Sequence, residues 1–200
     1  MAQDFNRKEK LEQIKQEVVN LENSFLAQER IKNKTFPVIG EGNHYAQIML
    51  VGEAPGKNEA LQGRPFCGQA GKILDKLLSS VGIDRQEVYI TNIVKDRPPN
   101  NRDPEPEEIE IYSSFLDRQI NIIQPKIIIG LGRFSSSYLL SKFNLNDEIK
   151  PISLIHGCVF QVQTNYGLIK IIPMFHPASC IYDRKKEQIM IQDFKNIWKN

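Results

Sequence analysis

The sequence predicts an α/β fold in which a mostly parallel sheet is covered by helices on both faces. Short apolar runs alternate along the chain with longer segments that carry apolar residues at helical spacing. This alternation is typical of strand–helix–strand units, whose strands lie parallel and whose helices pack on the sheet. No internal repeat and no low-complexity tract interrupts the pattern, so one continuous α/β unit is expected.

The apolar runs predict four strands, at residues 47–51, 88–94, 126–131 and 168–175. The first run, Ile48 to Val51, stops at Gly52 and leads into a glycine-rich turn, as expected for a buried strand that feeds a loop. Residues 158–163 are expected to pair with the last strand as a hairpin that turns at residues 164–167.

The remaining periodic segments predict five helices, at residues 4–28, 70–81, 106–123, 133–142 and 186–198. The first carries apolar residues from Leu11 to Phe25 on one face and charged or amide residues on most of the other. We expect it to dock on its own domain rather than on a coiled-coil partner. We expect residues 1–200 to form a single domain, in which residues 1–30 pack on the rest. The third helix begins at Pro106, where acidic residues suit the positive end of a helix dipole.

Composition and charge limit the class of protein and its partners. The 200 residues are 40% hydrophobic and 25% charged, ordinary values for a soluble globular domain with a substantial core. The formal net charge is only +2. Any nucleic-acid site must therefore arise from local clustering of basic residues rather than from bulk charge.

Cysteine use and the lack of long apolar runs indicate a cytoplasmic setting. Cys67, Cys158 and Cys180 are widely spaced and include no C-x-x-C pair, which provides neither a disulfide framework nor a four-thiolate metal site. This pattern is ordinary in a reducing compartment. No apolar run is long enough to cross a bilayer, and the N-terminus lacks a signal-peptide core.

Residues 51–71, VGEAPGKNEALQGRPFCGQAG, are the stretch around which the chain is organised. Gly52 lies where the first predicted strand ends and lets the backbone approach a ligand closely. Ligands of open α/β sheets bind beyond the carboxyl ends of the strands. Glu53, Glu59 and Phe66 are therefore placed where a binding site is expected.

Polar side chains also lie at or near the ends of two other predicted strands. Asn92 lies near the end of the second strand, and His176 follows the fourth. Each residue alone is weak evidence, because a lone Glu in a turn is usually solvated and a lone Asn or His is more often structural. Parallel strands, however, bring Glu53, Asn92 and His176 to one edge of the sheet. Their joint position favours a functional site, although composition names no reaction.

Four ordered motifs resemble those of the family-4 uracil-DNA glycosylases. They are GEAPG at residues 52–56, GRPF at 63–66, YITNIVKDRPPNNRDP at 89–104 and FHPAS at 175–179. The resemblance spans residues 36–198 and implies an α/β/α sandwich with a four-stranded, mainly parallel sheet. It implies a monofunctional enzyme of base excision repair that hydrolyses the N-glycosidic bond of deoxyuridine in DNA and leaves an abasic site.

The resemblance also implies roles for individual residues of this chain. Glu53 positions water or stabilises the sugar cation, and His176 donates a hydrogen bond to uracil O2, so these two residues are catalytic. Phe66 stacks on the flipped uracil, and Asn92 reads its edge. The implied uracil-binding residues are Gly52, Glu59, Phe66, Asn92 and His176.

Contacts to DNA are expected from a basic rim and from the segment after the His-Pro pair. The residues expected to bind DNA are Arg97, Arg102, Ser179, Ile181, Arg184 and Lys185. Basic side chains suit phosphates, and Ile181 or Tyr182 is the candidate wedge that replaces lost base stacking. The expected partner is uracil-containing DNA, single- or double-stranded, bound by a monomer with no role for a membrane.

The cofactor of the resembled family is not expected here. Family-4 enzymes hold a four-iron, four-sulfur cluster on four cysteines, and the third and fourth of these positions are occupied by Asp96 and Tyr112. The N-terminal region, where the other two are expected, contains no cysteine. We therefore expect no cluster and no metal, with Asp96 paired to a cation and the Tyr112 ring filling the vacated volume.

Three hypotheses remain open from the sequence. The chain is either an active, cluster-free uracil-DNA glycosylase or a non-catalytic DNA-binding or assembly module on the same scaffold. A third reading is a glycosylase with altered base choice, for example hypoxanthine or xanthine. Base release from DNA separates the three.

Overall fold

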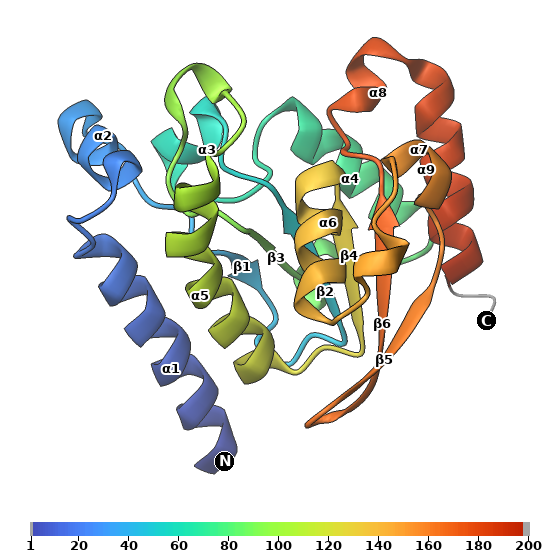
Figure 1. Cartoon of the computed structure of the whole chain (residues 1–200), viewed down its shortest axis with the longest axis horizontal. Helices are drawn as coiled ribbons and strands as arrows, with labels where there is room; N and C mark the ends of the chain where they lie inside the picture. Colours follow the sequence, from blue (N-terminus) through green and yellow to red (C-terminus); the bar gives the residue numbers. More distant parts are fainter. Residues whose placement is uncertain (1, 198–200) are drawn as a thin grey trace.

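The computed structural model describes residues 2–197, without the side chains of residues 2–5, 182 and 184, and within this range six strands form one sheet (Figure 1). They are β1 (Glu41–Gly42), β2 (Ile48–Gly52), β3 (Tyr89–Asn92), β4 (Ile127–Leu131), β5 (Phe160–Thr164) and β6 (Gly167–Met174). Their order across the sheet is β1-β3-β2-β4-β6-β5. The four central strands are parallel, whereas β1 and β5 run antiparallel to their neighbours.

The expected four-stranded sheet is therefore correct for the parallel centre but wrong for the sheet as a whole. The hairpin arm predicted at residues 158–163 forms β5 and extends the sheet beyond β6. Strand β1 has only two residues, which is too short to leave an alternating apolar pattern in a sequence. The sheet is mixed because one antiparallel strand is added at each edge of the parallel centre.

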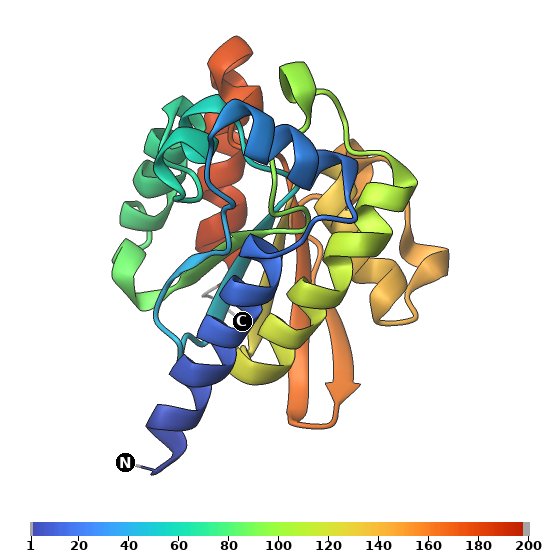
Figure 2. The ribbon, with the colours of Figure 1, turned by 90° about the vertical axis from the view of Figure 1, so that its left-hand side faces the viewer.

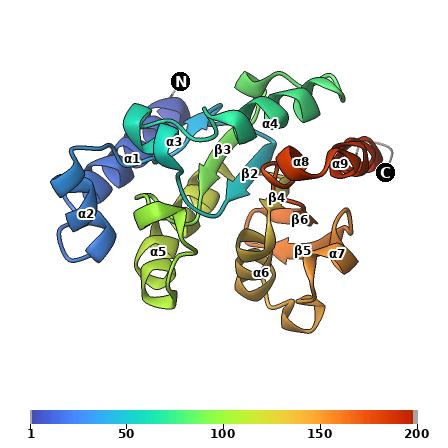
Figure 3. The same ribbon diagram turned by 90° about the horizontal axis from the view of Figure 1, so that it is seen from above.

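Helices cover both faces of the sheet, as Figure 3 shows from above. The described helices are α1 (Ala2–Val19), α2 (Phe25–Asn33), α3 (Lys57–Gln62), α4 (Gln69–Ser79), α5 (Pro106–Ile123), α6 (Arg133–Lys142), α7 (Ile152–Ile155), α8 (Ser179–Tyr182) and α9 (Arg184–Ile197). No described helix is both long enough and apolar enough to cross a bilayer. The predicted end of the last helix at Trp198 lies outside the described residues.

Two apolar cores lie on opposite faces of the sheet. Met49 and Val51 of β2 pack with α1, α2, α5 and α6, whereas Leu50 packs with α4 and α9. All three side chains are fully buried, as expected for a central strand covered on both faces. Because both faces are filled, a site is expected at the edge formed by the carboxyl ends of the strands.

The prediction of one helix over residues 4–28 is wrong, because the chain breaks between Val19 and Phe25. Ser24 caps the second helix by accepting a hydrogen bond from the Ala27 N–H, at 3.4 Å. The apolar spacing continues through the break, so periodicity alone could not reveal it. Helices α3, α7 and α8 were not predicted because each has six residues or fewer.

A buried polar network holds the two N-terminal helices against the rest of the fold. Arg30 donates to the last carbonyl groups of α1, at 3.0–3.1 Å, and its Nε lies 2.9 Å from Oδ1 of Asp96. The Tyr112 hydroxyl donates to Asp96 at 2.7 Å and lies 3.1 Å from the Ser24 hydroxyl. All four side chains are buried. The network joins α1, α2, the loop after β3 and α5, and Figure 2 shows α1 running beside α5.

We predict that Arg30→Met lowers the free energy of unfolding by about 3–5 kcal/mol, because it leaves the buried Asp96 carboxylate without its cation. Urea unfolding followed by circular dichroism measures the change. The control is Lys15→Met, which removes an exposed pair with Glu12 and should cost at most about 0.5 kcal/mol. Equal, small losses in the two variants would contradict the structural role of the pair.

Candidate active site

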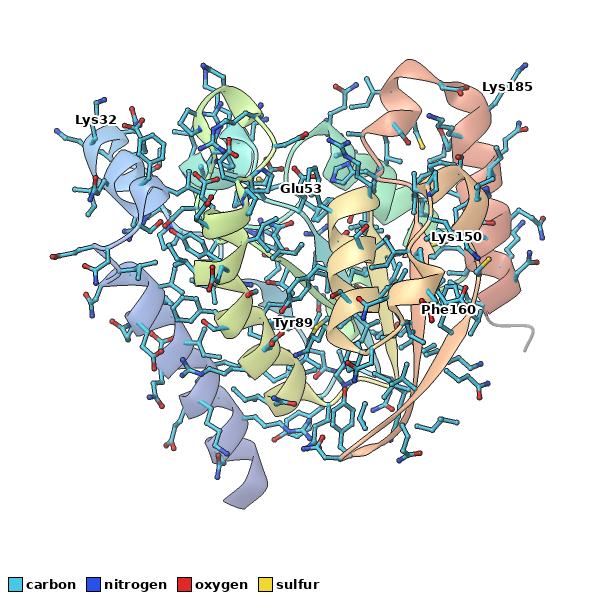
Figure 4. The ribbon with its side chains drawn as sticks, viewed as in Figure 1. Lys32, Glu53, Tyr89, Lys150, Phe160 and Lys185 are labelled. Atoms are coloured by element: carbon cyan, nitrogen blue, oxygen red, sulfur yellow. The ribbon has the colours of Figure 1, made fainter. Side chains whose placement is uncertain are left out.

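The site begins where β2 and β3 end side by side. The parallel register places Gly52 directly beside Asn92, and Glu53 continues beyond the sheet edge (Figure 4). A Cβ atom on Gly52 would lie 2.2 Å from Oδ1 of Asn92 and 2.8 Å from the Phe66 ring. Gly52 is therefore required for these two side chains to share one space.

Phe66 has an unusual backbone that aims its ring into this space. Its φ of +47° is rare for a bulky residue. Gly71 makes room for that conformation, since a Cβ there would lie 1.8 Å from the Phe66 carbonyl oxygen. The ring stacks on the imidazole of His176, with centroids 5.7 Å apart. Strain of this kind is concentrated at functional sites.

Glu59 shapes the loop that carries the ring. This residue of α3 accepts hydrogen bonds through Oε1 from the backbone N–H groups of Cys67, at 3.1 Å, and Gly68, at 2.9 Å. Both groups lie between Phe66 and the start of α4. The Glu59 carboxylate thus fixes the loop that carries Phe66, in addition to lining the cavity.

The protonation state of His176 follows from its surroundings. The backbone N–H of Ala178 donates to Nδ1 at 3.1 Å. Since an N–H group can only donate, Nδ1 carries the lone pair and the ring proton of the neutral form lies on Nε2. Burial lowers the pKa of His176 to about 4, although the Glu59 charge opposes this shift. The imidazole is thus neutral at pH 7, with Nε2–H as its donor.

Asn92 presents an acceptor that the described residues do not satisfy. The residue is 2% exposed, and its Oδ1 has no hydrogen-bond partner within the part of the chain that the structure describes. Buried polar atoms are nearly always paired. Because Asn92 lines a cavity, a ligand that donates a hydrogen bond would supply the missing partner.

Glu53 is poised between its protonated and ionised forms. Burial, reinforced by the negative charge of Asp103 and opposed by the positive charge of Arg133, raises its pKa to about 7. Asp103 and Arg133 form an exposed ion pair with each other. The charge of the Glu53 carboxyl group is therefore sensitive to the charges of these two residues.

One cavity of about 590 Å³ collects these groups from segments far apart in the sequence. Its wall includes Glu53, Glu59, Phe66, Asn92 and His176. Gly52 contributes through the absence of a side chain. The cavity offers an aromatic face, an amide with donor and acceptor, a neutral imidazole donor and a titratable acid. This set suits a flat heterocycle with carbonyl groups, while the role of each residue stays a prediction.

The residues expected to bind DNA differ in how free they are. Arg102 reaches the cavity wall, but its guanidinium bonds to both carboxylate oxygens of Glu108, at 2.9 and 2.5 Å. Arg97 donates to Oδ1 of Asn101 at 2.6 Å. Lys185 is exposed near the start of α9 (Figure 4). Ser179 and Ile181 lie on α8 and are half-buried, and the Arg184 side chain lies outside the described part.

Three charged residues near the site were missed by the sequence reasoning. Asp103 and Arg133 act on the pKa of Glu53, and Lys95 is buried three residues after Asn92. A signal existed for Arg133, which follows the end of β4 at the same sheet edge. No such signal existed for Lys95, because an isolated lysine in a proline-rich loop is expected in solvent.

Comparison with known proteins gives the same similarity over most of the chain. Residues 39–200 match the family described as the Uracil DNA glycosylase superfamily. A type-4 uracil-DNA glycosylase of Sulfurisphaera tokodaii is 45% identical over 188 residues, which cover 94% of this chain and 83% of the relative. That of Archaeoglobus fulgidus is 45% identical over 83% of this chain and 82% of the relative. That of Saccharolobus solfataricus is 46% identical, covering 80% and 74%.

We predict that Gly52→Ala displaces the Phe66 ring and lowers the free energy of unfolding by about 1–3 kcal/mol, because the added methyl group overpacks the site. A crystal structure and urea unfolding measure the two effects. Combining it with Phe66→Ala removes one of the two clashes, so Gly52→Ala should cost less in that background. An unmoved ring with unchanged stability would contradict the steric argument.

Proposed function

The chain belongs to the uracil DNA glycosylase superfamily, and from this premise we propose that it is a uracil-DNA glycosylase. It takes deoxyuridine out of the DNA stack, hydrolyses the N-glycosidic bond, releases uracil and leaves an abasic site. The observation that carries the proposal is the buried Asn92 amide with an unpaired Oδ1 in the wall of a cavity. Uracil is a flat ring whose N3–H group can donate to this oxygen and whose carbonyl oxygens can accept from donors in the wall.

Base selection follows from the hydrogen-bonding pattern of the Asn92 amide. Its Oδ1 accepts from uracil N3–H while its Nδ2 donates to O4. Cytosine presents the opposite pattern at these two positions. In a buried pocket that mismatch leaves polar groups unpaired at about 1–3 kcal/mol each. The Phe66 face adds about 1–3 kcal/mol of stacking, which offsets part of the cost of extruding the base.

Bond cleavage places negative charge on uracil and positive charge on the sugar. When the C1′–N1 bond breaks, its electron pair moves into the base, and the Nε2–H donor of His176 stabilises the charge at O2. A neutral donor does this without protonating the base first. The ionised Glu53 carboxylate stabilises the sugar cation and accepts a proton from the water that adds to C1′.

The DNA strand is held by the rim of the cavity. Lys185 is exposed and free to approach a phosphate, whereas Arg102 first exchanges Glu108 for the DNA backbone. Ile181 on α8 is the candidate for filling the gap left in the stack. Action as a monomer, on single- or double-stranded DNA and in the cytoplasm, stays a prediction from the sequence.

We further propose that the reaction needs no iron–sulfur cluster. The positions that the resemblance assigns to two ligands hold Asp96 and Tyr112, whose side chains bond to each other. Neither side chain fits an iron–sulfur cluster, because such clusters are held by cysteine thiolates. Of the cysteines, Cys180 packs against Met190 on the opposite face of the sheet. The Arg30–Asp96 pair supports the idea that ordinary side chains hold this region together.

The test of the proposal is uracil release from a uracil-containing oligonucleotide, followed by alkaline cleavage, with a chelator present and iron measured in the same sample. We expect release without iron. His176→Ala should lower the rate about 10²–10³-fold, and Asn92→Asp about 10–100-fold. The control is His156→Ala, which removes a histidine paired with Asp193 outside the cavity wall and should keep most of the rate. Folded protein that binds uracil-free and uracil-containing DNA equally, and releases no base, would instead indicate a non-catalytic module.

We also predict that kcat/KM rises with pH and levels off above an apparent pKa near 7, because ionised Glu53 is the active form. His176, with a pKa of about 4, stays neutral throughout this range. Asp103→Asn removes a charge that raises the Glu53 pKa, so the inflection should move to lower pH. Glu53→Gln should lower the plateau and abolish the inflection. A flat profile in the parent enzyme would contradict the assignment.

A further inference from the structure

Lys95 is a fully buried lysine whose ammonium group faces three oxygens. Its Nζ lies 2.7 Å from the main-chain oxygen of Asn92, 2.8 Å from Oγ1 of Thr91 and 2.7 Å from Oε1 of Gln119. The side chain is 0% exposed. None of the three partners is a carboxylate, so Lys95 differs from the paired cations elsewhere in the fold. A buried lysine of this kind needs a structural or functional reason.

The directions of the surrounding hydrogen bonds require three protons on Lys95. The Ile39 carbonyl oxygen can only accept, and it lies 2.7 Å from Oγ1 of Thr91 and 2.9 Å from Nε2 of Gln119. The Thr91 proton is therefore directed at Ile39, and the Gln119 amide is oriented with its oxygen toward Lys95. With Asn92 O as the third acceptor, Nζ must donate three times. Only the ammonium form has three N–H donors, since a neutral amine has two.

Burial acts against this charged form. It lowers the pKa of Lys95 well below its ordinary value. The three acceptors act in the opposite direction, because each bonds to the charged group and stabilises it. The network extends further, since Nε2 of Gln119 also donates to the Tyr89 hydroxyl at 3.1 Å. The charge is thus enclosed by groups of β3, α5 and the segment that contains Ile39.

We infer that Lys95 is the positioning residue of the base-reading site: its buried ammonium group clamps the main chain of Asn92 and so fixes the amide that reads uracil. This inference rests on the proposed function. Asn92 is the last residue of β3. Just beyond it, the N–H groups of Ile93 and Val94 still bond to the main-chain oxygens of Gly52 and Glu53, and the Asn92 carbonyl oxygen itself accepts from Lys95. The clamp ties that end to Gln119, near the C-terminal end of α5. The free Oδ1 is then held in place before the base arrives, which reduces the ordering cost of binding.

The test is a double-mutant cycle with Lys95→Met and Asn92→Ala, read as single-turnover uracil release. We expect Lys95→Met alone to lower the rate about 10–100-fold. In the Asn92→Ala background the same change should have at most about a threefold further effect, because the residue it positions is absent. Rate losses that multiply would overturn the positioning role.

Tyr112→Phe is the matched control for a general loss of stability. It removes a buried hydrogen bond to Asp96, in the same loop as Lys95, but it does not touch Asn92. Its rate should stay within about threefold of the parent after correction for the folded fraction. Should it slow release as much as Lys95→Met does, a positioning role specific to Lys95 is overturned.

Two further measurements keep the inference testable if Lys95→Met does not fold. Nitrogen-15 NMR of lysine-labelled parent protein should detect a protected ammonium signal at pH 7, and a neutral amine signal from Lys95 would overturn the assignment. Thr91→Val removes one acceptor and should slow release in the parent but not in Asn92→Ala. A parent protein that releases no uracil would refute the proposed function, whereas an active parent with independent Lys95 and Asn92 effects would refute only this inference.

Discussion

The polar groups of residues Thr91 to Asp96 are buried away from water and need partners inside the protein. The rest of the structure depends on this requirement. These residues end the central strand β3 and begin the loop after it, and their side chains include an ammonium and a carboxylate. Burying such groups is unfavourable unless each finds a partner. Gln119 supplies an acceptor for Lys95, and Arg30 supplies a cation for Asp96. The partners come from α5 and from α2, so satisfying one short segment fixes the position of two helices.

In the candidate site, by contrast, the described residues leave one buried polar atom without a partner. Asn92 lies within this buried segment, yet its Oδ1 has no partner in the described part of the chain. His176 is held in one tautomer by the Ala178 N–H, and Glu53 is brought to a pKa of about 7 by burial and neighbouring charges. A donor, an acceptor and an acid are thus set before any ligand binds. Such preorganisation is how a site stabilises charge without paying for reorganisation.

Close backbone approach is the second requirement of the site, and it depends on two glycines. Gly52 lets the Asn92 amide and the Phe66 ring occupy one space, and Gly71 lets Phe66 keep a positive φ. Neither glycine is at a flexible point of the fold, since both are buried. The close packing of β2 and α4 at these two glycines therefore helps to set the shape of the cavity.

The sequence alone predicted the four parallel strands and the longer helices, with α5 and α6 at their observed bounds, because apolar periodicity is a local property. It also predicted that Glu53, Asn92 and His176 would meet, since parallel strands end at one edge. The tertiary structure decided the break between α1 and α2, the added edge strands, the ion pair of Asp103 with Arg133 and the burial of Lys95. These features depend on which distant groups become neighbours once water is excluded. Such distances, and the charge states that follow from them, are not encoded in any local pattern of residues.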